Sequence, residues 1–117
     1  MGVSKSRARD AAKARLSADI VGYALGAARA EIFADDKGSP DAVFARQVAM
    51  YLCYTAFEIS LARVAVAFER DRSTVSHACH RIEDRRDEPQ FDQWIESLEA
   101  MARRAPLDAL TQEGIQP

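Results

Sequence analysis

The segment AFERDRSTVSHACHRIE, residues 67–83, holds the side chains best suited to binding chemistry. Its arginine, serine, threonine and histidine residues recur at spacings that place them on one face of a helix, opposite an apolar stripe. Guanidinium groups can bind guanine through two hydrogen bonds, and hydroxyl groups can reach bases or phosphates. A plain helical hairpin with a solvated face would favour lysine and glutamate over serine and threonine, which are mediocre helix formers. The pattern predicts a DNA-contacting helix with the polar face Arg72, Ser73, Ser76, His77, His80 and Arg81, and the apolar stripe Val75, Ala78, Cys79 and Ile82.

A shorter helix is expected directly before this one. Ser60 is a suitable N-cap, and an apolar stripe follows it up to the three-residue turn ERD. Two short helices joined by such a turn are typical of a helix-turn-helix, in which the second helix enters the major groove. Ala65 supplies the small residue that the first helix needs at the contact, and Val75 supplies the apolar residue that faces it. Asp71 is expected to cap the second helix, and Glu69 takes a turn position that often holds glycine.

The remaining sequence predicts an all-α domain of about five to six helices, because apolar residues recur mainly at spacings of three and four. We expect a basic N-terminal arm over 1–16, which could also extend the first helix, a helix-turn-helix domain over 17–105, and a loose tail over 106–117. Gly26 is expected to interrupt the first helix and a short turn to follow over 30–33. Asp41 is expected to cap a helix over 42–57. Pro89 is expected to begin the last helix, with the buried face Phe91, Trp94, Ile95, Leu98 and Met101.

Charge is unevenly distributed, although the net charge is only −2. Residues 1–15 and 60–86 are basic, whereas 16–45 and 87–117 are acidic. A DNA-binding protein is usually basic overall, so the distribution favours DNA binding more than the total does. The sequence has no long apolar run and no secretory signal, so we expect no membrane contact and a cytoplasmic, nucleoid-associated protein.

Metal and enzyme sites are not expected. His77 and His80 would point outward while Cys79 faces the core, so these groups could not share one zinc ion. Neither Cys53 nor Ser76 has a spaced base and orienting acid, so we expect no enzyme. The two cysteines, Cys53 and Cys79, fall at apolar positions and are interpreted as buried, reduced thiols.

Three segments, ARQVAMYL (45–52), SLARVAVAF (60–68) and RDRSTVSHACHRIE (70–83), together resemble the C-terminal DNA-binding domain of the bacterial replication initiator DnaA. The resemblance covers roughly residues 17–103. It implies an all-helical domain that binds short double-stranded boxes near a replication origin. It also implies base reading by Asp71, Arg72, Ser73 and Thr74, a backbone contact by His77, and a minor-groove contact by Arg46. Gln47 belongs to the same segment, and Ser76, His80 and Arg81 complete the expected DNA-binding set.

Two departures from this family pattern concern the regions nearest to DNA. The family usually has a Gly-Gly pair before "RD", but this sequence has only Glu69, which makes the turn one residue shorter. The loop before "ARQ" is normally rich in arginine, whereas here it reads ADDKGSPDAVF (34–44). Phosphate contacts are therefore expected to be fewer. In addition, Arg72 stands where the family usually has histidine, and Ser73-Thr74 where it has Thr-Thr, so base preference is expected to differ. The basic residues at 5–15, or a protein partner, could compensate.

The expected function is sequence-specific binding of double-stranded DNA in the regulation of replication initiation or transcription. No G-x-x-x-x-G-K-[ST] motif occurs, so neither ATP nor another cofactor is expected. The alternative is a protein-interaction module of the same fold with weakened DNA binding, which docks on a replication or transcription partner.

Overall fold

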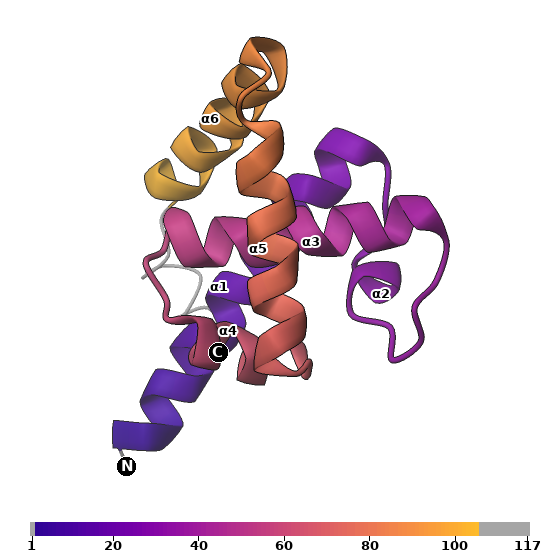
Figure 1. Ribbon diagram of the computed structural model, residues 1–117. Helices are drawn as coiled ribbons and strands as arrows, with labels where there is room; N and C mark the ends of the chain where they lie inside the picture. The colour runs from indigo at the N-terminus through magenta and orange to yellow at the C-terminus, as the bar shows by residue number, and fades with distance from the viewer. Residues whose placement is uncertain (1, 106–117) are drawn as a thin grey trace.

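The computed structural model describes residues 2–105, and all regular structure in that range is helical. Six helices follow one another: α1 (Gly2–Leu25), α2 (Arg29–Ile32), α3 (Pro40–Thr55), α4 (Leu61–Phe68), α5 (Arg72–Arg85) and α6 (Pro89–Arg104). Helix α3 runs through the middle of the molecule, with α5 crossing in front of it and α6 beside its C-terminal end (Figure 1). The predicted all-α class and number of helices are confirmed. The predicted loose tail, 106–117, lies outside the described residues.

Helix α1 is continuous across residue 16, so the basic N-terminal segment is not a separate arm. Its inner side packs through Ala14, Ala18 and Val21, all of which are buried. Asp10 is also buried, and its carboxylate accepts two hydrogen bonds from the Arg63 guanidinium of α4, at 2.8 and 2.6 Å. The second interpretation of this segment, as an extension of the first helix, is therefore the correct one.

The end of α1 depends on two glycines. Gly26 has a φ of +72° and its N–H donates to the Gly22 carbonyl at 2.7 Å, which closes the helix after Leu25. A Cβ on Gly22 would stand 2.4 Å from the carbonyl oxygen of Ala27, so the chain can fold back closely only past a glycine. The predicted interruption at Gly26 is confirmed.

Helix α3 begins two residues earlier than predicted. Its cap is Ser39, whose hydroxyl oxygen accepts a hydrogen bond from the Ala42 N–H at 3.2 Å, and not Asp41. Pro40 takes the first helical position, where its missing N–H costs nothing. The helix then supplies the centre of the core, because Ala45, Val48, Ala49, Leu52 and Cys53 are all fully buried.

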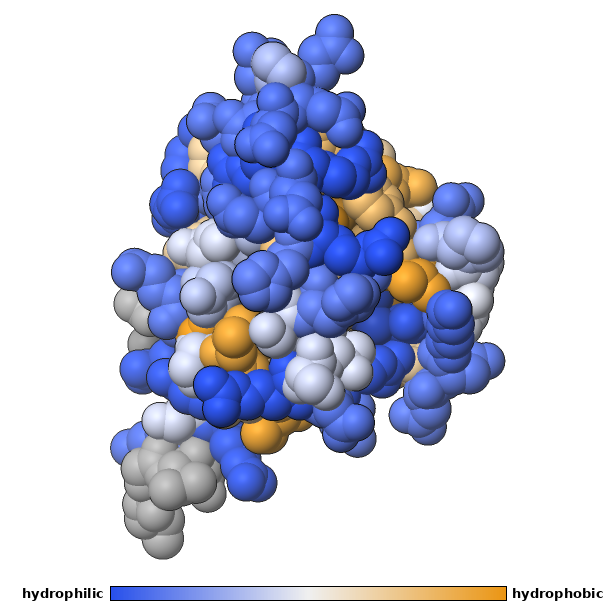
Figure 2. All heavy atoms as spheres, in the orientation of Figure 1, coloured by the Kyte–Doolittle hydropathy of each residue, from blue (hydrophilic) through white to orange (hydrophobic). Residues whose placement is uncertain are grey.

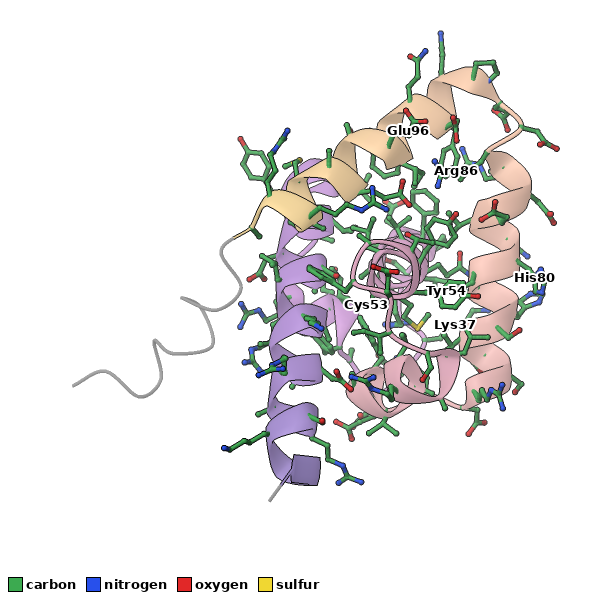
Figure 3. All side chains as sticks on the ribbon, turned by 90° about the vertical axis from the view of Figure 1, so that its left-hand side faces the viewer. Lys37, Cys53, Tyr54, His80, Arg86 and Glu96 are labelled. Carbon is green, nitrogen blue, oxygen red and sulfur yellow. The ribbon has the colours of Figure 1, made fainter. Side chains whose placement is uncertain are left out.

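A polar network fixes the C-terminal part of α5 against α3 and α6. Arg86 donates to Asp92 at 2.5 Å, to Glu99 at 3.2 Å and to the Tyr51 hydroxyl at 3.1 Å, and Tyr51 donates to Glu83. Burial lowers the pKa of Arg86, but its bonds to Asp92 and Tyr51 more than offset this effect and leave the pKa raised. Figure 3 shows Arg86 turned inward at this junction, while His80 points away from the molecule. The network therefore fixes the orientation of the C-terminal end of α5 relative to α3 and α6.

Helix α6 begins at Pro89, as predicted, and packs through Phe91, Ile95 and Leu98. Trp94 is only half-buried and stacks on Phe44 with ring centroids 6.2 Å apart. The prediction of a buried Met101 is wrong, since this side chain is 39% exposed. Among the helices described, none is both long and apolar enough to cross a membrane.

Candidate nucleic-acid interface

The turn between α4 and α5 is held by a residue in an unusual backbone conformation. Ser60 caps α4, as predicted, and accepts from the Arg63 N–H at 3.3 Å. Glu69 ends the helix with φ 54° and ψ 48°, the left-handed region that glycine usually occupies. The next N–H, of Arg70, donates to the Ala65 carbonyl at 3.0 Å. The sequence thus forms the expected turn without the glycine that this geometry favours.

Helices α4 and α5 pack as the sequence predicted. Ala65 and Val75, the expected contact pair, are 8% and 0% exposed. The rest of the predicted stripe on α5 is buried too: Ala78, Cys79 and Ile82. This packing orients the opposite side of α5 toward solvent.

The polar face of α5 is exposed at its N-terminal half, which is the part that a recognition helix presents to bases. Asp71 takes the N-cap position but its side chain makes no capping hydrogen bond, so its carboxylate is free for another donor. Ser76 alone of the predicted set on this helix is half-buried. The exposed members are Asp71, Arg72, Ser73, Thr74, His77, His80 and Arg81. In Figure 2 the front of the molecule, along α5, is largely hydrophilic.

A hollow runs between this polar face and the loop that joins α2 to α3. Gln47 is half-buried and lines it together with His77 and Arg81. An adjoining hollow of about 320 Å³ is lined by Thr74 and His77 of α5 and by Asp35 and Asp36 of the loop. The hollow therefore brings polar groups of α5 and carboxylates of the loop to one edge.

Arg46 is buried, unlike the exposed DNA-binding residues predicted on α5, although it lines the same hollow as Gln47, Thr74 and His77. It is 5% exposed, and its guanidinium donates to the carbonyls of Ile32 at 2.7 Å, Glu31 at 2.9 Å and Lys37 at 3.0 Å. Burial lowers its pKa, the charge of Arg70 lowers it further, and Asp36 opposes both. In this conformation all three guanidinium nitrogens are engaged with the loop. The minor-groove contact that the resemblance implies for Arg46 stays a prediction, and it would require the guanidinium to leave these three carbonyls.

Arg70 has a similar function that the sequence did not indicate. It lies in the turn before α5 and donates to the Ala34 carbonyl at 2.5 Å. Together Arg46 and Arg70 bind four carbonyls of the segment 31–37. No local pattern marks Arg70 for this role, since its partner is 36 residues away in the sequence.

The cysteines and histidines form no reactive cluster. Burial raises the pKa of Cys53 to about 12 and that of Cys79 to about 11, so both are thiols at neutral pH. Within residues 2–105 no three His, Cys, Asp or Glu side chains gather in a way that could hold a metal ion.

Residues 18–82 match the family described as bacterial dnaA protein helix-turn-helix. The chain belongs to this family. It is 33% identical over 82 residues to the chromosomal replication initiator protein DnaA of Lachnoclostridium phytofermentans. The aligned residues make up 68% of this chain and 18% of that protein. This chain thus spans about a fifth of the length of that DnaA relative.

Two solved structures share the fold of this DnaA-family domain. One is a crystal structure of a DNA replication initiation factor, with a TM-score of 0.77 and 28% identity over 87% of this chain and 32% of the other. The second is a replication initiator DnaA bound to AMPPCP and single-stranded DNA, with a TM-score of 0.74 and 27% identity over 87% of this chain and 31% of that one. The resemblance noted in the sequence is therefore confirmed at the level of family and fold.

Proposed function

We propose that this DnaA-family domain binds double-stranded DNA sequence-specifically by inserting the N-terminal half of α5 into the major groove. The observation that carries the proposal is the exposed polar face of α5, which is turned outward because Val75 on its opposite side is buried in the same core as Ala65 of α4. Arg72 can reach guanine, Asp71 can accept from cytosine, and Ser73 and Thr74 can bond either bases or phosphates. His77, His80 and Arg81 extend this surface toward the sugar-phosphate backbone.

The biological role that fits this activity is control of replication initiation, or of transcription, at sites that a DnaA-type initiator also recognises. The family membership and the names of the relatives support this role. Such a protein would compete with the initiator for shared boxes or act on nearby promoters.

The test is a fluorescence anisotropy titration with a labelled duplex selected by this protein from a random pool, compared with a scrambled duplex. Arg72→Ala and Thr74→Ala are each expected to weaken binding to the selected duplex by about 1–3 kcal/mol, the range for a good base contact. Binding to the scrambled duplex should change much less. Arg104→Ala is the matched control, since this arginine is exposed at the end of α6. Equal affinity of Arg72→Ala, Thr74→Ala and the parent protein for the selected duplex would count against the proposal.

A second candidate function is a protein-interaction module that has weakened DNA binding. The observation that favours it is the pair of exposed carboxylates, Asp35 and Asp36, at the edge of the hollow beside α5. In that case no duplex would be retained in a mobility-shift assay even at low salt, where phosphate contacts are strongest.

A further inference from the structure

Two neighbouring arginines at the C-terminal end of α5 lie in opposite environments. Arg86 is turned into the protein, where carboxylates of α6 accept its hydrogen bonds (Figure 3). Arg85 is exposed, and within residues 2–105 it forms no salt bridge. Its guanidinium carbon instead stands 4.0 Å from the ring centroid of Phe91 and 5.4 Å from that of Phe44. Arg85 is therefore a cation that rests on aromatic rings and has no carboxylate in ion-pair contact.

The two rings hold the Arg85 side chain in place. Phe91 is buried and Phe44 is half-buried, so neither ring is free to move away. A guanidinium within about 6 Å of a ring is attracted to the face of that ring. Its N–H donors lie in the guanidinium plane and stay available to a further partner. The side chain therefore loses less freedom when it binds an anion than an unsupported arginine would.

Arg85 extends the polar face of α5 beyond the residues predicted to contact DNA. His77, Arg81 and Arg85 follow one another at spacings of four, so they lie on one side of the helix. At about 1.5 Å per residue, Arg85 lies about 17 Å along α5 from Thr74. The major groove is only about 8.5 Å deep. When the N-terminal half of α5 contacts bases, Arg85 is therefore outside the groove, at the level of the phosphates.

The surface around Arg85 is cationic. The hollow between the C-terminal half of α5 and α3 is lined by Arg81 and Arg85, with Asp84 as its acidic residue. The adjoining hollow shares Arg81 and adds Lys37, and among the described residues no carboxylate lines it. The two exposed aspartates of the α2–α3 loop line a third hollow, beside the N-terminal half of α5. Three cations and one carboxylate thus give this flank of α5 the charge that suits a DNA backbone.

We infer that Arg85, held in place by Phe91 and Phe44, binds a DNA phosphate that flanks the bases read by the N-terminal half of α5. The inference rests on the proposed DNA binding and adds a contact outside the residue set predicted from the sequence. The two phenylalanines are positioning residues that act through Arg85. A phosphate contact raises affinity for every duplex and carries no sequence information. It thereby offsets in part the phosphate contacts expected to be missing from the α2–α3 loop.

The experiment compares Arg85→Ala with the parent protein on the selected and the scrambled duplex by fluorescence anisotropy, between about 50 and 200 mM salt. Loss of one phosphate contact should weaken binding to both duplexes alike and reduce the slope of log affinity against log salt by about 0.9. The ratio of parent to variant affinity should therefore fall roughly 3.5-fold across this range of salt. Arg104→Ala is the matched control, because it removes an exposed arginine at the end of α6. That variant should leave both the affinity and the slope close to those of the parent.

Phe91→Leu tests the positioning role, because leucine keeps an apolar side chain at this position but offers a cation no aromatic face. It should weaken binding to both duplexes by up to about fivefold, the full strength of an exposed cation–π contact. In the Arg85→Ala background it should have no further effect. Phe44→Leu should act in the same way but more weakly, since its ring is farther from the guanidinium, and it replaces Phe91→Leu if that variant does not fold. Folding of each variant is checked by thermal unfolding followed by circular dichroism.

The outcomes separate this inference from the proposed function. Weaker and less salt-dependent binding by Arg85→Ala, with ring variants that are silent in its background, supports the phosphate contact. If Arg85→Ala binds like Arg104→Ala while the parent still prefers the selected duplex, the contact is refuted and the reading function remains. If Arg85→Ala loses affinity for the selected duplex alone and keeps the parent slope, Arg85 reads a base and the phosphate role is refuted.

Two further results decide the remaining parts. Ring variants that weaken binding equally with and without Arg85 would refute the positioning role of the phenylalanines. If Arg85→Ala behaves as expected but the parent binds both duplexes equally, sequence-specific reading fails and the phosphate contact stands. Failure of the parent to bind any duplex would refute both proposals.

Discussion

The α4–α5 pair and the α2–α3 loop border the same hollow, yet different forces shape them. The helix pair is organised by apolar burial: Ala65 of α4 and Val75 of α5 are both buried in the core, and the polar side chains are left outside. The loop is organised by hydrogen bonds from two arginines to backbone carbonyls, with no apolar residue as large as leucine in segment 34–39. Arginine therefore has two opposite uses beside one hollow. Arg72 is exposed and can bind a ligand, whereas the Arg46 guanidinium is hydrogen-bonded to three backbone carbonyls of the protein itself.

The sharpest way to test this contrast is to remove each arginine and measure unfolding. Arg46→Ala deletes three charge-assisted hydrogen bonds and leaves carbonyls near the core without donors. The expected loss in the free energy of unfolding is about 3 kcal/mol. Arg72→Ala should cost less than about 0.5 kcal/mol, as is usual for an exposed surface position. Urea denaturation followed by Trp94 fluorescence measures both.

A different result would reverse the assignment of Arg46. If Arg46→Ala were as stable as the parent but bound DNA poorly, the side chain would have to leave the loop carbonyls and contact the ligand. That outcome would restore the minor-groove role that the family resemblance implies.

The two regions also differ in how far the sequence predicts them. The α4–α5 pair follows from local signals, since the Ser60 cap and the spacing of Val75, Ala78 and Ile82 all lie within a few residues of the structure they specify. The same holds for Pro89 at the start of α6. Periodicity and caps are local in sequence, and they decide where helices form and which side they bury.

The loop and the first helix depend on partners that are far apart in sequence. Arg46 bonds carbonyls 9 to 15 residues away, and Arg63 pairs with Asp10 across 53 residues. The family resemblance assigns Arg46 to the minor groove, and the charge pattern alone leaves the segment around Asp10 as either an arm or an extension of the first helix. The predicted roles of the exposed α5 residues remain predictions.

The anchor at the other end of α5 can be tested through pH. Burial, followed by the hydrogen bond with Glu83, raises the pKa of Tyr51 from its ordinary value near 10 to about 12. The unfolded chain therefore loses this proton first as pH rises, and the stabilising effect, complete below pH 10, disappears as pH approaches 12. The expected loss is on the order of 2 kcal/mol. If the polar network holds α5 as firmly as its apolar packing against α4 does, α5 should not detach by itself. Loss of the Tyr51 proton should then lower the free energy of global unfolding.

Tyr51→Phe is the matched control for this titration. Cys53 and Cys79 also have raised pKa values and contribute to a decline above pH 9, so the parent curve alone does not isolate the tyrosine. Urea midpoints measured between pH 9 and pH 12 should fall less steeply above pH 10 in Tyr51→Phe than in the parent. Parallel curves would mean that the Tyr51 hydroxyl does not couple to folding.

The smallest expected effect concerns the turn itself and has a built-in comparison. Glu69 and Glu58 both have a φ of 54°, but only Glu69 lies in the turn before α5. An L-residue in this region costs roughly 1–2 kcal/mol, and glycine loses about 0.5–1 kcal/mol in chain entropy, so Glu69→Gly and Glu58→Gly should each stabilise by about 0.5 kcal/mol. Thermal unfolding should show similar shifts for the two variants, whereas anisotropy should show altered DNA affinity for Glu69→Gly alone. Destabilisation by Glu69→Gly, with stabilisation by Glu58→Gly, would mean that the glutamate side chain holds the turn and that its backbone is not strained.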